Sequence, residues 1–481
     1  MLLNTLKMAC INLMVFLFLT VGFVVCECAD SVFVETAAEL IKLFRDAKGN
    51  TLQTDIEVTA DLDFSASTLT FPLGVSDDGG TCVSFSGVFQ GNGHSIKGLE
   101  MDNTYKTGYK GAGLFCSLKN ATVENIVIDS SCYFSGYGDG VSALSVSVNG
   151  SLSLKNVTNK AVVSGYYRVG SFIGQIEKME ETAIISFENC VNDAKVTGSG
   201  NCVGGFVGLI WSNPNNVTIT VSNSTNNGIA TGKWYVGGLI GYILGNTNIT
   251  VTISNSTNNG KVIGSKQFLG GLIGVVSSDN SHSATVNIIN CANKGSVSTD
   301  EIMACGFVCV DPQNNNKVKT TVINSINKGR VSTNNYGEQF SFGITNIITK
   351  ARNVVSMGTI LNYRGSYTFW NVSTDVRKFY GMNGDCVRCN DDAILFRFND
   401  KTKLYEVTKG LNRVDDLLNY ESEKRGYGML WSRKLDLVHV KEEDPTQSSQ
   451  LSQLSQLSLA VIQQLSPLAF IVALSTLFIA L

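Results

Sequence analysis

Residues 217–242 have the sequence VTITVSNSTNNGIATGKWYVGGLIGY, and this stretch contains both elements that decide the fold. The first element is a strictly alternating segment that ends in an Asn-rich turn, and the second is a short segment rich in glycine. Residues 249–274, ITVTISNSTNNGKVIGSKQFLGGLIG, repeat both elements in the same order. Alternation of apolar and polar residues is the period of a β-strand with one buried face.

Both elements recur with one period along the chain. The last Asn of the turn is found at Asn159, Asn192, Asn226, Asn258, Asn293 and Asn327, in steps of 33, 34, 32, 35 and 34 residues. The Gly-rich element begins at Val169, Val203, Val236, Leu269 and Ala304, in steps of 34, 33, 33 and 35 residues. Two markers that keep one period indicate a repeat architecture built from a stack of equivalent units.

The repeated unit is a β unit and not a helical one. Its apolar residues alternate, and the chain has 47 Gly and only 5 Pro, with Asn-Gly or Asn-Lys-Gly in the later units where a turn needs a positive φ. We therefore predict an all-β fold, a parallel β-helix (solenoid) of ~33-residue repeats, with an N-terminal capping helix and a small C-terminal region. An antiparallel β-sandwich or a propeller with several strands per repeat is the alternative.

The region before the repeats carries a resemblance to a known family. Residues 84–99 (SFSGVFQGNGHSIKGL) are followed by 111–115 (GAGLF) and 121–128 (ATVENIVI). This succession resembles the entry coils of right-handed parallel β-helix cell-surface proteins with GLUG-motif repeats, and VGGLIG resembles the GLUG motif itself. The resemblance covers residues 31–358 and implies a binding, adhesive or spacer module. Cys305 and Cys309 depart from the motif, because they replace two of its glycines.

The chain divides into six segments. Thr36-Ala37-Ala38-Glu39 fits a capping box, and the apolar residues that follow have helical spacing, which predicts an amphipathic helix that covers the open end of the stack. The predicted segments are a signal peptide at 1–28, the capping helix at 30–48, the parallel β-helix with GLUG-like repeats at 49–358, a C-terminal cap or small membrane-proximal domain at 359–445, a polar Gln/Ser/Leu stalk at 446–466 and a hydrophobic tail at 467–481.

Sequence features at both ends of the chain predict where the protein is located in the cell. Residues 1–28 have a basic start, an apolar core and small residues at the cleavage site, as in a secretory signal; an uncleaved signal anchor is the alternative. The polar stalk and the terminal apolar tail match a glycosylphosphatidylinositol (GPI) attachment signal, with a membrane-spanning tail helix as the alternative. This predicts a protein on the extracellular face of the plasma membrane. The candidate attachment residues are Ser448, Ser449, Ser455 and Ser458.

Secretion agrees with the potential N-glycosylation sites. Eight Asn-x-Ser/Thr sequons begin at Asn120, Asn149, Asn156, Asn216, Asn223, Asn248, Asn255 and Asn371. Counting alternate positions outward from the apolar residues of the strands places Asn216 and Asn248 on the solvent face. The same count places Asn223 and Asn255 on the inward face unless the turn breaks the alternation, so we expect lower occupancy there.

No catalytic, cofactor or metal site is predicted. The acidic residues of the repeats do not recur at matching positions, and His94, His282 and His439 are the only histidines. Cys386-Val387-Arg388-Cys389 lacks a second ligand pair for zinc, so we interpret Cys386 and Cys389 as candidates for a structural disulfide. Removal of residues 1–28 would leave ten cysteines, an even number. A net charge of −3 argues against a nucleic-acid partner.

Three functions are compatible with these features. The first is an adhesin or binding surface for a glycan, a host molecule or another cell, with Trp234 and Tyr235 as a possible binding patch. The second is a structural coat or spacer protein without a single ligand. The third is an enzyme that acts on polysaccharides, which would need converging carboxylates. The sequence favours the first and does not predict an enzyme.

The lipid anchor makes a prediction of its own. Phosphatidylinositol-specific phospholipase should release the mature protein from the cell surface, because its hydrophobic tail would have been exchanged for a lipid. Truncation at Gln447 should give a secreted protein. Mass spectrometry of the surface protein decides the matter, since recovery of peptides from 467–481 would rule out the lipid anchor.

Overall fold

The computed structural model describes most of the chain up to residue 333 and separate pieces beyond it. The described residues are 31–47, 51–67, 69–76, 79–105, 109–177, 179, 181–279, 281–313, 317–333, 341–342, 347–356, 360–361, 366–367, 371–381, 393–399, 404–407, 419, 423 and 431–432. The predicted signal peptide, stalk and hydrophobic tail lie outside these residues.

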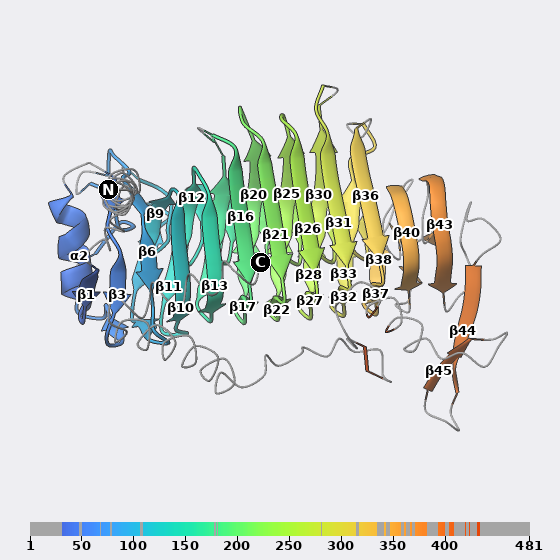
Figure 1. Cartoon of the computed structure of the whole chain (residues 1–481), viewed down its shortest axis with the longest axis horizontal. Helices are drawn as coiled ribbons and strands as arrows, with labels where there is room; N and C mark the ends of the chain where they lie inside the picture. Colours follow the sequence, from blue (N-terminus) through green and yellow to red (C-terminus); the bar gives the residue numbers. More distant parts are fainter. Residues whose placement is uncertain are drawn as a thin grey trace, which may run out of the picture.

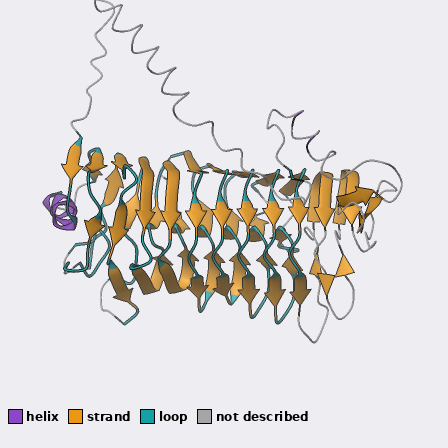
Figure 2. Cartoon of the chain, turned by 90° about the horizontal axis from the view of Figure 1, so that it is seen from below, coloured by secondary structure: helices purple, strands orange, loops and turns teal. Residues whose placement is uncertain are grey.

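The described chain is a parallel β-helix, which confirms the predicted fold class. Three sheets of short strands run along one axis, and the coils in the middle of the stack contribute strands to all three sheets. Figure 1 shows the coils in sequence order from one end of the stack to the other, and Figure 2 shows the same coils turned by 90°. Within the described residues every pair of named strands is parallel except β44 with β45.

The first sheet has 21 strands, which include both halves of a bent strand in most coils. They are β1 (Val32–Val34), β3 (Ile56–Val58), β4 (Leu62–Asp63), β6 (Val88–Gln90), β7 (Ser95–Lys97), β10 (Ala121–Ile128), β13 (Leu152–Asn159), β16 (Ala183–Glu188), β17 (Val191–Asn192), β21 (Val217–Ser222), β22 (Thr225–Asn226), β26 (Ile249–Ser254), β27 (Thr257–Asn258), β31 (Ala284–Ile289), β32 (Ala292–Asn293), β36 (Val318–Ile323), β37 (Ile326–Asn327), β40 (Ile347–Ser356), β43 (Asn371–Gly381), β44 (Ala393–Asn399) and β45 (Leu404–Val407).

The second and third sheets have 15 and 9 strands. The second consists of β8 (Glu100–Asn103), β11 (Tyr133–Val141), β14 (Val162–Gly170), β18 (Val196–Gly198), β19 (Asn201–Gly204), β23 (Ala230–Gly232), β24 (Trp234–Gly237), β28 (Val262–Gly264), β29 (Leu269–Gly270), β33 (Val297–Thr299), β34 (Ala304–Cys305), β38 (Val331–Thr333), β39 (Ser341–Phe342), β41 (Ile360–Leu361) and β42 (Ser366–Tyr367). The third consists of β2 (Leu52–Gln53), β5 (Ser84–Ser86), β9 (Phe115–Leu118), β12 (Ser145–Val148), β15 (Ile173–Ile176), β20 (Val207–Ser212), β25 (Ile240–Gly245), β30 (Ile273–Ser278) and β35 (Val308–Val310).

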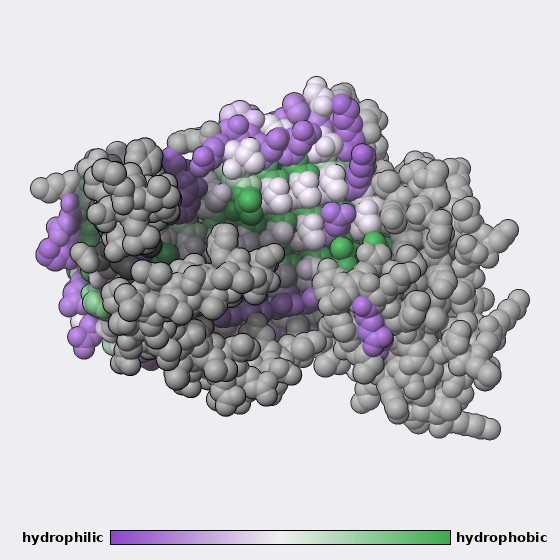
Figure 3. Space-filling view, viewed as in Figure 1, coloured by the Kyte–Doolittle hydropathy of each residue, from purple (hydrophilic) through white to green (hydrophobic). Residues whose placement is uncertain are grey.

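The alternation seen in the sequence separates the interior from the surface. In β21, Ile219 and Val221 are at most 1% exposed, while Thr218 and Thr220 point outward. β21 pairs with β26 in register, so that Thr220 lies beside Thr252. In the coloured part of Figure 3, rows of near-neutral side chains run from coil to coil, in agreement with the pairing of Thr with Thr in successive strands.

A ladder of buried Asn side chains runs through the turns of the repeats. The six Asn residues that mark the repeat are 0% exposed: Asn159, Asn192, Asn226, Asn258, Asn293 and Asn327. In each coil the Nδ2 donates to the Oδ1 of the next Asn, as Asn226 does to Asn258 at 2.8 Å and Asn258 to Asn293 at 2.9 Å. Each Nδ2 also donates to the carbonyl two residues further on, which satisfies a buried turn.

The Asn ladder lies directly against the Gly-rich elements. A Cβ placed on Gly238, the middle glycine of its element, would lie 2.5 Å from Cγ of Asn258 in the next coil. The same clash would occur between Gly205 and Asn226 at 2.7 Å. The two sequence markers therefore keep one period because they touch one another in the folded chain.

The predicted capping helix is confirmed and covers the first coil. Helix α2 (Ala37–Asp46) begins with the predicted capping box, in which Thr36 Oγ1 accepts from the Glu39 amide at 3.2 Å and Glu39 Oε2 accepts from the Thr36 amide at 3.1 Å. Phe44 packs its ring 6.0 Å from Phe85 and 5.8 Å from Phe115. Figure 1 shows α2 at one end of the stack, where it shields the apolar ladders from water.

The predicted boundary at residue 358 does not end the strand pairing. β43 pairs in parallel with β40, and β44 pairs in parallel with β43, so the first sheet continues into the segment expected to be a separate C-terminal region. The sequence repeat becomes irregular there, but backbone pairing needs only extended strands and no particular side chain. β44 and β45 then form an antiparallel pair.

We expect the buried Asn ladder to be a major source of stability. Asn258→Ala should lower the free energy of unfolding by about 3 kcal/mol, because it leaves the amides or carbonyls of Asn226, Asn293 and Gly260 without a buried partner. The matched control is Asn259→Ala, since Asn259 donates to Asn227 on the exposed side of the same turn; its cost should stay below about 0.5 kcal/mol. Equal losses in urea unfolding would show that the buried ladder adds no special stability.

Candidate binding surface

The patch predicted at Trp234 and Tyr235 is mostly a packing cluster. Tyr235 lies on β24 with a φ of 55°, and its ring centroid is 4.7 Å from that of Tyr242 and 5.9 Å from that of Phe268. Tyr242 donates to or accepts from Ser277 at 2.8 Å, and burial raises the pKa of Tyr242 to about 12. Tyr235 is therefore fixed among its neighbours, whereas Trp234 lies half-buried at the edge of the cluster.

This cluster belongs to a line that we call the outer seam, where β24 and its equivalents meet β25 and its equivalents on the outside of the coil. The residue before the Gly-rich element has a positive φ in every repeat, at Arg168, Cys202, Tyr235, Phe268 and Met303. Phe268 and Met303 are 8% and 4% exposed and pack with Val275, Cys305 and Cys309. The seam is thus a second, smaller apolar cluster outside the main core.

A charged network closes the other end of the outer seam. Arg168 Nη1 donates to Gln175 Oε1 at 2.5 Å and lies 3.5 Å from Glu177 Oε2. Gln175 Nε2 donates to Glu177 Oε1 at 2.9 Å, and the Glu177 residue is 8% exposed. Burial of a carboxylate is tolerated here because it is paired and hydrogen-bonded. The three side chains thus provide hydrogen-bond and ion-pair partners for one another, and they connect β14 to β15.

Exposed aromatic side chains gather on the second sheet, two coils before Trp234. Tyr137 and Tyr166 stack with ring centroids 4.6 Å apart and an interplanar angle of 20°, and Tyr166 meets Tyr167 edge-on at 4.1 Å. Tyr137 is 49% exposed and Tyr167 is 38% exposed. We call these three residues the tyrosine cluster. A β-bulge in β11 between Gly136 and Asp139 brings Tyr137 beside Tyr166 of the next coil.

The sequence contains a signal for this cluster that periodicity alone does not reveal. Residues 133–137 (YFSGY) and 162–166 (VVSGY) place a Tyr directly after a Ser-Gly pair in two successive coils. Later coils have Ser199 and Lys233 after the corresponding glycine. The sequence did not place Tyr137 and Tyr167 in this cluster, because the bulge and the positive φ of Arg168 are set by the fold.

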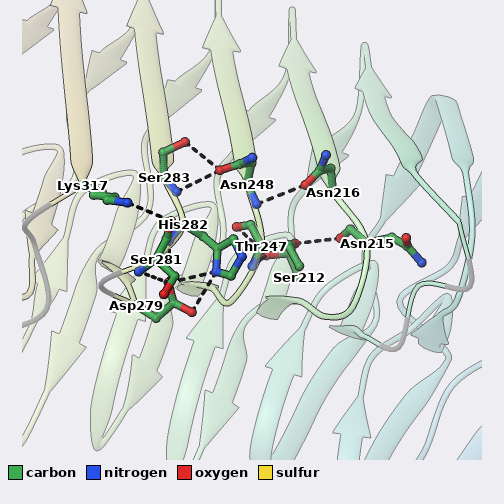
Figure 4. Close-up of polar contacts among 10 residues, drawn as sticks. All are labelled: Ser212, Asn215, Asn216, Thr247, Asn248, Asp279, Ser281, His282, Ser283 and Lys317. Carbon is green, nitrogen blue, oxygen red and sulfur yellow. Dashed lines mark hydrogen bonds and ion pairs between the residues drawn. The ribbon is translucent and has the colours of Figure 1, made fainter.

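His282 and His94 each lie beside one aspartate, and the two pairs are far apart in the stack. Figure 4 shows Asp279 accepting from the Ser281 amide at 2.8 Å and the His282 amide at 2.7 Å, with His282 Nδ1 2.9 Å from Asp279 Oδ2. These bonds hold the Asp279 pKa below its usual value, with the His282 side chain as the largest cause. Asp279 thus caps a turn. His94 lies 3.7 Å from Asp61 at the opposite end of the stack. In the described part of the chain no group of three His, Cys, Asp or Glu side chains could hold a metal ion.

The structure corrects the predicted orientation of two sequons. Asn223 and Asn255 have φ values of 49°, and this left-handed turn breaks the alternation, so that Asn223 is exposed and Asn255 is half-buried. The buried positions are instead taken by Ser224 and Ser256, which are 0% exposed.

Asn216 and Asn248 point outward, as expected. Asn216 Oδ1 accepts from the Asn248 amide at 3.2 Å, and Asn248 Oδ1 accepts from the Ser283 amide at 3.0 Å. In Figure 4 both Nδ2 atoms, which would carry a glycan, point away from these bonds.

The remaining sequons differ in the hydrogen bonds and the exposure of the Asn side-chain amide. Asn120 donates to Glu181 at 3.1 Å and Asn156 donates to Asn125 at 2.8 Å, and both residues are exposed. Asn149 is half-buried, with its amide oriented to donate to the carbonyls of Val148 and Glu177 at 3.1 and 3.2 Å. For Asn371 only the backbone is described, as part of β43.

The described residues contain two disulfides, at positions that the sequence did not suggest. Cys82 pairs with Cys116, and Cys305 pairs with Cys309 at the end of the outer seam. The predicted candidates Cys386 and Cys389 lie outside the described residues. Four further cysteines are buried thiols: Cys132, Cys190, Cys202 and Cys291.

Two of these thiols replace a buried hydroxyl of the repeat. Cys190 and Cys291 occupy the column that holds Ser224, Ser256 and Ser325 in other coils, and the Cys190 amide donates to Ser224 Oγ at 3.0 Å. Burial raises the pKa of the Cys190 and Cys291 thiols to about 12, which makes both thiols poor nucleophiles. They act as core residues.

The predicted lipid-attachment residues Ser448, Ser449, Ser455 and Ser458 also lie outside the described residues. In the part of the chain that the structure describes, no helix has both the length and the apolar character that crossing a membrane requires.

Comparison with known proteins gives two similarities. No protein-family model matches the chain. Over 97 residues, which are 20% of the chain, it is 32% identical to Halomucin of Haloquadratum walsbyi, and the match spans 1% of the length of that protein. The fold is similar to that of a "putative immunoglobulin A1 protease" from Bacteroides ovatus, with a TM-score of 0.41 and 14% sequence identity over 72% of this chain and 84% of the other. The assignment of a parallel β-helix rests on the strand pairing of the chain itself.

The geometry of the sequons predicts their occupancy. Asn216, Asn223 and Asn248 should carry glycans in the secreted protein, since each is exposed and the glycan can extend into solvent. Asn149 should be unmodified in the folded protein, because its half-buried amide contacts two carbonyls. Site-resolved glycopeptide mass spectrometry measures all four sites. Full occupancy at Asn149 together with empty Asn216 and Asn248 would contradict the assignment of faces.

Proposed function

We propose that this chain is a secreted, GPI-anchored and glycosylated surface protein whose β-helix presents a binding face to a glycan, a host molecule or another cell. The observation that carries the proposal is the tyrosine cluster, an exposed group of aromatic side chains held on rigid, paired strands. The signal peptide, the sequons and the hydrophobic tail of the sequence support the location.

The cluster differs from the phenylalanine rings of the described chain, most of which lie in the interior. The largest fully buried side chains are all Phe: Phe64, Phe85, Phe89, Phe115, Phe134, Phe172, Phe187, Phe206 and Phe307. Tyr137 and Tyr167, in contrast, keep 49% and 38% of their surface in water. Exposed Tyr and Trp side chains are typical of recognition surfaces, since they offer a large contact area with few rotatable bonds.

The strands that carry the tyrosine cluster are rigid, and this favours recognition of a ligand. The tyrosine cluster stands on β11 and β14, which pair with one another and continue the second sheet on both sides. A rigid strand holds its side chains in place before a ligand arrives, which lowers the entropy lost on binding. A spacer protein has no need for exposed rings in fixed positions, so the cluster favours a binding surface over a coat without a ligand.

The proposal is tested with the full-length protein, purified in detergent and applied to a glycan array and to intact cells. We expect saturable binding that weakens at least about tenfold in the triple variant Tyr137→Ser, Tyr166→Ser, Tyr167→Ser, because aromatic anchors carry much of the affinity of a recognition surface. Tyr105→Ser is the control, since Tyr105 is 95% exposed and outside the cluster. Absence of saturable binding to every surface would favour the coat or spacer function instead.

A further inference from the structure

Strand register places a second aromatic residue in line with the tyrosine cluster. Asn201 pairs with Trp234, and Val169 pairs with Val203. Arg168 and Cys202 share a positive φ, of 54° and 63°, so the register continues two residues back and sets Tyr167 beside Asn201. Tyr167, Asn201 and Trp234 thus occupy one column of three successive coils. We call this column the aromatic row.

The three side chains of the aromatic row all face outward. Tyr167 is exposed, and Asn201 and Trp234 are half-buried, and none of them belongs to the main core. Parallel strands are about 4.8 Å apart, so Tyr167 and Trp234 stand about 10 Å apart along the axis with the Asn201 amide between them. The row therefore alternates an aromatic ring, a hydrogen-bonding amide and a second aromatic ring.

The chain makes room for the Tyr167 ring. Gly200 lies beside it in the next coil, where a Cβ would come within 2.9 Å of two Tyr167 ring carbons and within 2.6 Å of the Tyr166 carbonyl oxygen. With glycine there, the ring can lie close to the sheet and leave 38% of its surface in water. Tyr166, stacked on Tyr137, supports it from the other side.

We propose that the aromatic row binds a β-1,4-linked hexopyranose chain laid along the axis of the β-helix. Such a chain is a flat ribbon that presents the same ring face at every second sugar, which matches two rings separated by two coils. The axial C–H groups of a pyranose are apolar and pack on an aromatic face, and the sugar hydroxyls can exchange hydrogen bonds with the Asn201 amide.

The chemistry of the neighbouring positions favours a sugar chain over a protein. The outward positions beside the row carry hydroxyls, with Ser164 paired to Thr197 and Thr197 to Thr231, all half-buried. A protein partner would need a contiguous apolar surface that excludes water at the centre of the interface. Alternating rings and hydroxyls instead match a ligand whose surface is itself divided between C–H faces and hydroxyl edges.

The inference deepens the proposed function and rests on it, and its test uses defined ligands. Cellohexaose and chitohexaose are titrated by calorimetry into the full-length protein, followed by the variants Tyr167→Ala, Trp234→Ala and Asn201→Leu. We expect one hexasaccharide or both to bind, and we expect each variant to weaken binding by about tenfold. Tyr167→Phe should bind as the parent does, because it keeps the stacking face.

The control is Tyr133→Ala, which removes a 39% exposed ring from the same sheet but outside the row. Circular dichroism confirms that each variant keeps the parent fold. Binding that persists in both Tyr167→Ala and Trp234→Ala, or no binding of either hexasaccharide by the parent, overturns the inference. If the parent then still binds cells or other glycans on the array, the proposed function stands and the ligand or the site is a different one.

Discussion

The fold depends on the contact between a buried Asn and the glycine of the preceding coil. Asn258 bonds to Asn226, Asn293 and the carbonyl of its own turn, and this arrangement requires Gly238 to lack a side chain. Buried amides must be satisfied, so the turn can close only when the next coil supplies the same amide. A single repeat cannot meet this condition, whereas a stack meets it at every interior coil. The interaction thus couples the stability of each coil to its neighbours.

The same constraint leaves the outside of the coil free to vary. Equivalent interior positions in successive coils are occupied by Val, Ile, Leu or Phe. Equivalent buried turn positions are occupied by Asn and by Ser, or by the isosteric Cys190 and Cys291. Outer columns change from coil to coil: the outer seam contains Arg168, then Cys202, then three large apolar residues before the Cys305–Cys309 disulfide. Function can therefore be placed on a few coils without disturbing the stack, as the tyrosine cluster illustrates on β11 and β14.

Much of the fold could be predicted from sequence because its signals are local and repeated. The alternation in residues 217–221 gave the buried face, and the capping box at Thr36 and Glu39 gave helix α2. Prediction was wrong where the backbone departs from alternation. Asn223 and Asn255 were expected to point inward, but their left-handed φ turns them out. Strand pairing continues past the boundary expected at residue 358, because β43 pairs with β40 through backbone groups that need no repeat in the side chains.

The sequence by itself determined the repeat, its period, the core-facing residues and the positions of the Asn and Gly markers. These follow from hydrophobic alternation and from turn residues, both of which act within a few residues. Only the tertiary structure decided which outer residues share a column. Tyr167 and Trp234 are separated by 67 residues. This separation is one residue longer than two 33-residue repeats. The extra residue lies in the turn around Gly200, before Asn201 pairs with Trp234. Register across coils is set by backbone hydrogen bonds over the whole sheet, and a bulge or a positive φ shifts it by one residue without a periodic sequence signal.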